Sequence, residues 1–398
     1  MTSFPPLDVL NVIAQTTKLK EGSEAVRLIM WLIYQHSKLS TKKLSRLTQI
    51  PLPVLSAVLN ELKKEGLVER RRGTQLSASG LDFVENVFHF RKVPPVKCPQ
   101  CASKTLIIPA ELTNLLSVLR NYSSQAPSSK TTLDQARCTP ETSLLRSLYL
   151  LDAGDLAGKR LLFLGDNDLT ALACALVTSH FSLKSEFTVV DIDNDLLQFL
   201  ANVSKKENFQ IQLILHDLRK PLPQMLKEKF DVIITDPPYT SPGVLLFLSR
   251  GIECLVHPRG GKNLYLSFNA RGDEEMHVLQ HSFLEMNLFF KHILPAFNTY
   301  IGAEILGNVS QFIHLKSLKN AKPFYVGEFL EPIYTGELKI TKRTYLCINC
   351  RLEIKVGKTE KFVTIEALKA HGCPKCQKLK FRLLKRNSQN LEGNQARG

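Results

Sequence analysis

Carboxylates follow three strand-like runs in the middle of the sequence, and this spacing is the first sign of chemistry. The runs 161–164, 187–190 and 232–235 are short, apolar and rich in β-forming residues. They lead into Gly165-Asp166-Asn167-Asp168, Asp191-Ile192-Asp193 and Asp236-Pro237-Pro238-Tyr239, in that order. Runs of this kind, separated by helical segments, predict parallel strands whose carboxyl ends line one crevice. We therefore expect the three acidic clusters to face a single ligand site.

The first of these loops departs from the usual pattern of a nucleotide site. A Gly-x-Gly turn normally stands there, so that backbone N–H groups can approach a phosphate or a carboxylate. In this chain Asp166 and Asp168 follow Gly165 instead. Two carboxylates repel an anionic ligand tail and attract a cationic one. The sequence thus predicts a nucleoside ligand with a positively charged tail.

The other strand ends indicate how the nucleoside would be held. Asp191 is placed to accept hydrogen bonds from ribose hydroxyls, and we favour this over a merely solvated acidic loop. Asp217 ends a further predicted strand, where an adenine amine would lie, although a helix-capping Asp looks the same in sequence. The predicted nucleoside contacts are Gly165, Asp166, Asp191, Asp193, Asp217 and Asp236.

The Asp-Pro-Pro-Tyr motif that starts at Asp236 is typical of nucleoside-dependent enzymes that alkylate nitrogen. The rigid Pro-Pro backbone and the acid orient an amine lone pair toward an electrophilic sulfonium, and the aromatic ring packs over the acceptor. Glu304 in a predicted strand 300–304 is a further candidate, with a plain edge position as the alternative. The predicted substrate contacts are Asp168, Pro237, Pro238, Tyr239 and Glu304.

Cysteine pairs predict a metal site near the C-terminus. Cys347-x2-Cys350 and Cys373-x2-Cys376 supply four thiolates, which complete a tetrahedral zinc site with no open position, so the zinc would be structural. The pair Cys98 and Cys101 lacks two further ligands, and both half of a metal site and two free thiols stay open. Paired thiols of this kind favour a reducing, cytoplasmic setting over a disulfide framework.

The fold that should position these residues is α/β. We expect a Rossmann-like sheet of the S-adenosylmethionine-methyltransferase type, a winged-helix domain before it and a zinc-ribbon-like module after it. The predicted domains are residues 1–95 (winged helix), 96–138 (Cys-x-x-Cys knuckle and linker), 139–335 (catalytic domain), and 336–398 (zinc-ribbon-like module and basic tail). The last two strands of the sheet are predicted at 300–304 and 311–314.

The winged-helix prediction rests on residues 24–86. Three helical patterns, over 25–36, from Ser40 to Leu47 and from Pro51 onward, precede a basic two-stranded wing at 68–76. Asn60, Lys63 and Lys64 could contact DNA, but such domains also serve packing and dimerisation. A homodimer is the default expectation.

Charge separates the predicted catalytic core from its flanks. The chain carries a net charge of +15, yet residues 151–330 hold 17 Lys and Arg against 20 Asp and Glu. Residues 341–398 hold 14 against 4, with a basic and mobile tail for which nucleic-acid binding and solubility compete as explanations. No apolar run approaches the ~20 residues of a membrane span, and the N-terminus lacks a signal pattern, so we expect a cytoplasmic protein.

Taken in order, the loop 165–170, Asp191-Ile192-Asp193, the segment 216–222 and Asp236-Pro237-Pro238-Tyr239-Thr240 resemble the branched-chain polyamine synthases. The resemblance implies aminopropyl transfer from decarboxylated S-adenosylmethionine to the secondary amine N4 of spermidine, then a second transfer, with release of methylthioadenosine. The family's loop reads Gly-Asp-Asp-Asp, so Asn167 departs from it, and many members have Glu where Tyr239 stands.

The resemblance also implies roles for the acids. Asp168, with Asp166 beside it, would orient the acceptor amine and take its proton, while Asp236 would hold the attacking nitrogen. Two other functions stay open from the sequence. One is an amino-methyltransferase acting on DNA or RNA, which the Asp-Pro-Pro-Tyr motif also fits. The other is a DNA-binding regulator that senses a nucleoside.

Overall fold

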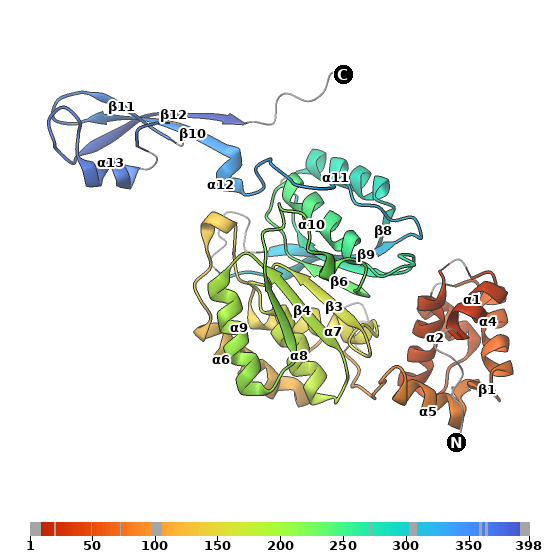
Figure 1. Cartoon of the computed structure of the whole chain (residues 1–398). Coiled ribbons are helices and arrows are strands. Elements are labelled where there is room, and N and C mark those ends of the chain that lie inside the picture. Colours follow the sequence, from red (N-terminus) through yellow and green to blue (C-terminus); the bar gives the residue numbers. More distant parts are fainter. Residues whose placement is uncertain are drawn as a thin grey trace. The chain divides into compact units, whose positions relative to one another are not determined.

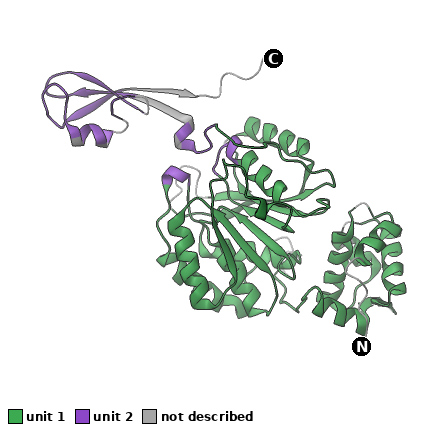
Figure 2. Ribbon diagram, viewed as in Figure 1, with its two compact units in different colours: residues 1–130, 135–237, 244–330 green, residues 131–134, 238–243, 331–398 purple. Residues whose placement is uncertain are grey.

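The computed structural model describes residues 9–19, 21–48, 50–71, 73–96, 106–270, 272–301, 309–357, 360–362 and 365–390. The chain forms two compact units, shown in two colours in Figure 2. The core unit comprises residues 1–130, 135–237 and 244–330, and the C-terminal unit comprises residues 131–134, 238–243 and 331–398. The division into four domains drawn from the sequence stays a prediction.

A seven-stranded mixed sheet lies at the centre of the core unit (Figure 1). Its strands, in spatial order, are β5 (Ile211–Leu215), β4 (Glu186–Asp191), β3 (Arg160–Leu164), β6 (Val232–Thr235), β7 (Asn263–Phe268), β9 (Val309–Ser317) and β8 (Leu288–Thr299). The strands from β5 to β7 are parallel, and β9 runs antiparallel to both of its neighbours. Leu164 pairs with both Val190 and Thr235, so the three acidic loops leave the sheet side by side. The predicted α/β class is confirmed, and the three acidic loops lie at one edge of the sheet, as expected.

Helices cover both faces of this sheet, with α8 and α9 on one side and α10 and α11 on the other (Figure 1). Their bounds are α6 (Thr113–Gln125), α7 (Pro140–Asp152), α8 (Thr170–His180), α9 (Asn194–Glu207), α10 (Ser241–Cys254) and α11 (Asp273–Glu285). Helix α8 is apolar all round and buried along nearly its whole length, as expected of a helix enclosed on every side. Short 3-10 turns lie at Ala110–Leu112, Thr131–Leu133 and Gln224–Leu226.

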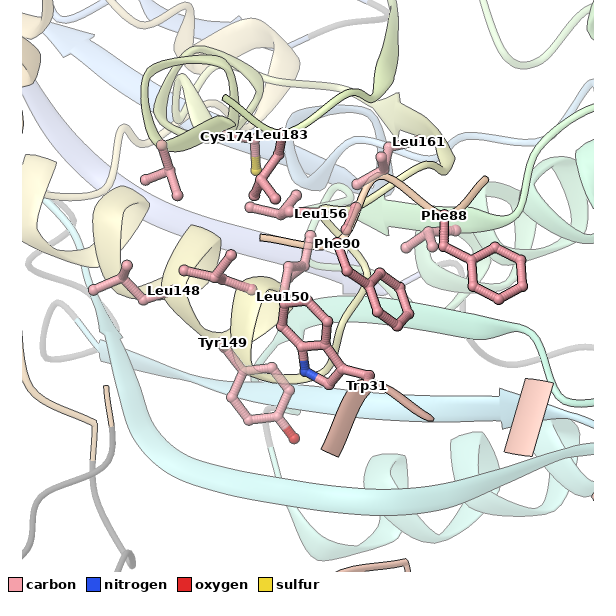
Figure 3. Close-up of a cluster of buried hydrophobic side chains, with 14 of the residues drawn as sticks. Trp31, Phe88, Phe90, Leu148, Tyr149, Leu150, Leu156, Leu161, Cys174 and Leu183 are labelled. Carbon is pink, nitrogen blue, oxygen red and sulfur yellow. The ribbon is translucent and has the colours of Figure 1, made fainter. Parts of the chain in front are cut away.

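The N-terminal segment of the core unit is helical, with one hairpin. Its elements are α1 (Val9–Thr16), α2 (Ser23–His36), α3 (Thr41–Thr48), α4 (Leu52–Lys64), β1 (Val68–Arg70), β2 (Thr74–Leu76) and α5 (Ala78–Asn86). Strands β1 and β2 pair antiparallel. Trp31 Nε1 donates to Asp152 O at 3.1 Å, and Arg27 donates to the carbonyls of Gly154 and Ala157. Figure 3 shows Trp31 and Phe90 beside Tyr149 and Leu150 of α7, in one hydrophobic core.

The C-terminal unit contains a three-stranded antiparallel sheet in the order β11-β10-β12. Its elements are α12 (Thr335–Leu338), β10 (Lys339–Cys347), β11 (Glu353–Val356), α13 (Ile365–His371) and β12 (Phe381–Asn390). Tyr345, Ile354, Phe362 and Leu368 form its small hydrophobic core.

Three sequence-based predictions need correction. A strand does not begin at Tyr300: β8 ends at Thr299, and Glu304 lies outside the described residues. Residues 381–390 are not a free tail, because β12 pairs with β10 along this stretch. Residues 96–138, predicted as a knuckle and linker, contain helix α6 (Thr113–Gln125). In each case long-range pairing or packing decides the conformation, and the local pattern does not report it.

Within the described part of the chain, no helix combines the length and the apolarity that crossing a membrane requires.

Candidate active site

The loop from β3 to α8 makes a tight turn that needs its glycine. Gly165 has φ 72°, a left-handed conformation that side chains other than glycine rarely adopt, and its N–H donates to Val190 O at 2.9 Å. Leu169 at φ 57° then turns the chain into α8. The loop is thereby held between β4 and the first turn of α8, with Asp166 and Asp168 on it.

Asp166 occupies the N-terminus of α8. Its Oδ1 accepts from Thr170 N at 2.9 Å, and its Oδ2 accepts from Ala171 N at 3.1 Å. Burial raises the pKa of Asp166 well above the usual carboxyl value, against the effect of these N–H donors. Free N–H groups at a helix N-terminus are what an anionic ligand group normally binds. Here the side chain of Asp166 already uses two of them.

The second acidic cluster is also engaged within the protein. Asp191 accepts from Asp166 N at 3.0 Å and from Asp193 N at 2.8 Å, so it ties the two loops together. Burial raises its pKa. Asp193 caps α9 through Asp195 N at 3.1 Å and pairs with Lys130 Nζ at 2.6 Å. Both residues line the expected edge of the sheet, and their contact with a nucleoside stays a prediction.

Asp168 of the first loop and Asp236 of the third loop form an acid pair, in which each group shifts the pKa of the other. Asp168 Oδ1 accepts from Cys138 N at 2.6 Å, and its side chain is 4% exposed, whereas that of Asp236 is 16% exposed. Burial raises the pKa of Asp236 well above its usual range, and the charge of Asp168 adds to this. Burial acts to raise the pKa of Asp168, but the charge of Arg146 and the hydrogen bonds from Arg146 and Cys138 N together outweigh it and leave that pKa lowered.

Arg146 of α7 joins the two acids. Its side chain is 2% exposed, and each nitrogen of its guanidinium donates to side chains of the site. The contacts are Nε to Asn298 Oδ1 (2.8 Å), Nη1 to Asp168 Oδ2 (2.6 Å) and Thr170 Oγ1 (3.4 Å), and Nη2 to Asp236 Oδ2 (2.9 Å) and Tyr300 Oη (3.2 Å). Tyr300 also donates to Asp236 Oδ2 at 2.7 Å. One buried cation therefore serves two carboxyl groups.

Asn167, the departure from the family's loop, has a structural role. Arg137 Nε donates to Asn167 O at 2.8 Å, and its Nη2 donates to Asn167 Oδ1 at 3.1 Å. Asn167 Nδ2 donates in turn to Ser129 Oγ at 3.1 Å. Asn167 thus links the acidic loop to the chain segment that precedes α7, and it does not add a third carboxylate to the loop.

The remaining predicted contacts are placed as follows. Asp217 follows β5 and pairs with Arg219 Nη2 at 2.8 Å, which lowers its pKa against the effect of burial. Pro237 directly follows Asp236 in the core unit, whereas Pro238 and Tyr239 belong to the C-terminal unit. Glu304, Cys98 and Cys101 lie outside the described residues.

Sequence reasoning missed Arg146, Asn298, Tyr300 and Arg137. For Arg146 a signal existed: it is the one charged residue between Glu141 and Asp152, in a helical stretch rich in leucine. A lone charge in such a helix calls for a buried partner. Tyr300 contacts Asp236, Asn298 contacts Arg146 and Arg137 contacts Asn167. They do so from segments whose approach to the loop only the folded chain reveals.

The four C-terminal cysteines of the predicted zinc site come together in the C-terminal unit. The Sγ atoms of Cys347, Cys350, Cys373 and Cys376 all lie within 4.8 Å of one another. Cys347 faces Cys376 and Cys350 faces Cys373, each pair at 3.5 Å. Zinc bound tetrahedrally by thiolates at about 2.3 Å would separate the sulfur atoms by about 3.8 Å. The donor set and its spacing fit that ion.

Comparison with known proteins decides the family. A family model described as the branched-chain polyamine synthase A C-terminal domain matches residues 114–363, well over half of the chain. The chain belongs to the branched-chain polyamine synthase family. The resemblance stated from the acidic loop and the Asp-Pro-Pro-Tyr motif is confirmed, and with it the expectation of a transferase.

Curated relatives from one archaeon extend the match. An uncharacterized protein of Methanocaldococcus jannaschii is 38% identical over 381 residues, which cover 95% of this chain and 93% of that protein. The N(4)-bis(aminopropyl)spermidine synthase of the same organism is 31% identical over 261 residues, covering 65% of this chain and 73% of the synthase.

A solved member of the family shares the fold. The branched-chain polyamine synthase of Thermus thermophilus, in complex with N4-aminopropylspermidine and 5'-methylthioadenosine, superposes with a TM-score of 0.53 at 24% identity. The match covers 83% of this chain and 98% of that one.

Proposed function

We propose that this chain transfers aminopropyl groups from decarboxylated S-adenosylmethionine to the secondary amine N4 of spermidine. The first transfer gives N4-aminopropylspermidine, the second gives N4-bis(aminopropyl)spermidine, and each releases methylthioadenosine. The named relatives carry this activity in their names, and the solved Thermus enzyme is described with one of these products and with methylthioadenosine.

The observation that carries the proposal is the state of the α8 N-terminus. S-adenosylmethionine has a carboxylate that needs free N–H donors in its binding site. Decarboxylated S-adenosylmethionine lacks this carboxylate. Asp166 already accepts from Thr170 N and Ala171 N, so those donors are used whether the carboxyl group is neutral or ionised. A carboxylate-bearing donor would face an acid in the place where it needs N–H groups. The decarboxylated donor meets no such conflict.

We propose further roles for the predicted contact residues in binding the donor nucleoside and the acceptor. We assign Asp191 to the ribose, with Gly165 and Asp193 shaping that edge, and Asp217 to the adenine. Pro237, Pro238 and Tyr239 would pack against the acceptor, and Glu304 stays a candidate for its far end. The sequence-based hypothesis made Asp168 the base. Asp168 is the less exposed acid and is held by Arg146 and Cys138, which favours Asp236 as the group that touches the acceptor nitrogen.

We assign the C-terminal unit a structural role. Cys347, Cys350, Cys373 and Cys376 would hold one zinc ion as thiolates in a zinc-ribbon-like module. The ion would link the turn after β10 to the segment before β12 and stabilise a small core. It would leave no position open for substrate. Reduced thiols favour the cytoplasm as the site of the reaction.

The N-terminal helices and hairpin have the order expected of a winged helix, which we propose as a packing and dimerisation module. Asn60, a suggested DNA contact, has its amide oxygen engaged by Arg70 Nη1 at 2.5 Å. Lys64 pairs with Glu61 at 2.6 Å. The engagement of Asn60 favours a packing role for helix α4 over DNA binding. Sedimentation of the purified chain tests the expected homodimer.

One assay tests the function. The purified chain is incubated with either decarboxylated S-adenosylmethionine or S-adenosylmethionine, and with spermidine, linear polyamines of other lengths, or oligonucleotides. Products are resolved by mass. We expect one and then two aminopropyl groups on spermidine, with methylthioadenosine formed in equal amount. Methyl transfer to an oligonucleotide without aminopropyl transfer would refute the proposal. Tight oligonucleotide binding without turnover would favour a regulator.

A further inference from the structure

Arg146 stands out among the buried side chains because it contacts both members of the acid pair. Its Nη1 lies 2.6 Å from Asp168 Oδ2, and its Nη2 lies 2.9 Å from Asp236 Oδ2. Asn298 Oδ1 accepts from its Nε at 2.8 Å and fixes the plane of the guanidinium. The planar fork of an arginine can serve two carboxylates at once, whereas a lysine ammonium is a single point charge.

The negative charges of Asp168 and Asp236 would repel each other, and the positive charge of Arg146 offsets this repulsion. Two adjacent, buried carboxyl groups cannot both ionise without a nearby cation, so one of them normally keeps its proton. Burial and the charge of Asp168 both raise the pKa of Asp236, and Arg146 opposes them. The other groups around the pair are Tyr300, which donates to Asp236, and Cys138, Asp166 and Arg137 around Asp168.

We propose that Arg146 is a positioning residue for the transfer: its charge, held against both acids, favours the ionised form of Asp236 beside ionised Asp168, so that Asp236 can accept a proton from the acceptor amine. This inference rests on the proposed function. Asp168, enclosed behind Arg146, supplies the negative charge that makes Asp236 a stronger base than an isolated carboxylate. Asp236, the more exposed of the two, makes the contact with substrate.

The proton and electron pairs balance as follows. The secondary ammonium of the acceptor gives one proton to Asp236, which frees the nitrogen lone pair. The lone pair forms a bond to the aminopropyl carbon that carries the sulfonium. The bond from that carbon to sulfur breaks, and its electron pair goes to sulfur, which leaves as the neutral thioether of methylthioadenosine. The product nitrogen keeps its second proton, and Asp236 later releases the first to water.

The proposal has a consequence for pH. Activity needs ionised Asp236, so it falls as the pH falls through the pKa of that group. Removing the charge of Arg146 raises this pKa further and moves the acid limb of the kcat/KM profile to higher pH. A residue that only stabilises the fold would lower the height of the profile and leave the position of its acid limb unchanged.

The test compares Arg146→Met and Arg146→Lys with wild type, with Arg250→Met as the matched control. Arg250 is also fully buried, but it donates to Leu218 O and to Glu253, away from the acid pair. We expect the acid limb to move up by about one pH unit or more in Arg146→Met, by less in Arg146→Lys, and not at all in Arg250→Met.

An acid limb that stays at its wild-type pH in Arg146→Lys and Arg146→Met would overturn the role of Arg146. If Arg146→Met does not fold, Arg146→Lys decides, because it keeps a charge while losing the fork that serves both acids. A different result would refute the proposed function itself: no aminopropylated product from the wild-type chain at any pH.

Discussion

Asp166, Asp168 and Asp236 are chemically identical side chains that the fold holds in three different environments. Asp166 accepts hydrogen bonds from backbone N–H groups of α8, and Asp168 is enclosed by Arg146 and Cys138 N. The side chain of Asp236 is more exposed than that of Asp168. The environment therefore divides among them the tasks of shaping the donor site, holding charge and contacting substrate.

Asp236→Asn removes the proposed proton acceptor with little change in shape. The amide oxygen can still accept from Arg146 and Tyr300, so we expect the fold to persist. Because the amide cannot take a proton, we expect kcat to fall by about 10²–10⁴-fold, the usual size of a general-base contribution. Steady-state rates and thermal melting measure both effects. Asp231→Asn is the control, since Asp231 is paired with Arg160 at 3.0 Å outside the crevice. Wild-type rates in Asp236→Asn would contradict the assignment.

Asp166→Ala frees the N–H groups of Thr170 and Ala171. We expect a loss of about 1 kcal/mol in the free energy of unfolding, as for other lost helix caps. We also expect the affinity for S-adenosylmethionine to rise about tenfold or more relative to the decarboxylated donor, because the helix N-terminus can then receive a carboxylate. Calorimetric titration with both ligands gives this ratio. An unchanged ratio would mean that Asp166 does not set donor choice.

At the residue scale, the sequence alone predicts several residues of the site, and there is a physical reason why it misses the others. The strand-end acids could be predicted because parallel strands bring their ends together whatever the rest of the chain does. Arg146 could not be assigned a role, because its partners depend on how α7 packs against the sheet. Asn167 could be seen only as a departure from a motif, and its bonds to Arg137 and Ser129 came from the structure.

Helix α7 is the element that completes the site. Thr139 caps it by accepting from Thr142 N at 3.3 Å, and Pro140 occupies its first turn. One turn later Arg146 faces the acid pair, while Tyr149 packs into the core around Trp31 (Figure 3). The start of this helix could be predicted from its capping residues, whereas the side that faces the acids could not.

Strand β8 shows why the edge of the sheet was misplaced. Its burial does not alternate, it contains Pro295, and its register against β9 shifts twice. Irregular edge strands tolerate proline and bulges, so their sequences lack the period-two pattern that marks a strand. Asn298 at the end of β8 nevertheless reaches Arg146, so this irregular element contributes to the site.

The C-terminal unit leads to a prediction about metal. We expect about one zinc per purified chain, and loss of the metal with a lower melting temperature in Cys373→Ser, because three thiolates no longer close the site. Cys254→Ser, which changes a buried cysteine outside the cluster, should keep its zinc. Elemental analysis with thermal melting gives both readouts. Chelated, metal-free protein with unchanged stability would refute a structural ion.

At the scale of the whole molecule, the core unit joins its N-terminal helices to the sheet through one hydrophobic core. Trp31 is 1% exposed and contacts Phe90 with ring centroids 5.0 Å apart. Lys159 adds a buried ion pair between the segments, with its Nζ 2.9 Å from Glu24 and 2.8 Å from Asp155. The N-terminal segment thus stabilises the catalytic sheet directly.

Trp31→Ala tests this coupling. We expect the free energy of unfolding to fall by about 3–5 kcal/mol, as for other large-to-small substitutions in a core. The control Trp31→Phe should lower it by less. Trp31 is the chain's single tryptophan, so its fluorescence reports on this contact in the unmodified protein. During denaturation the fluorescence change should coincide with the loss of activity. A fluorescence transition well before the activity is lost would mean that the segment detaches independently.

Donor choice is the property that the acidic crevice most directly determines, and binding can be measured without turnover. Calorimetric titration of the wild-type chain with decarboxylated S-adenosylmethionine and with S-adenosylmethionine, under identical conditions, compares ligands that differ only in the carboxylate. We predict binding of the decarboxylated donor that is tighter by about a hundredfold or more, since the carboxylate would lie beside Asp166, whose side chain already engages Thr170 N and Ala171 N. Equal affinity, or tighter binding of S-adenosylmethionine, would contradict the account.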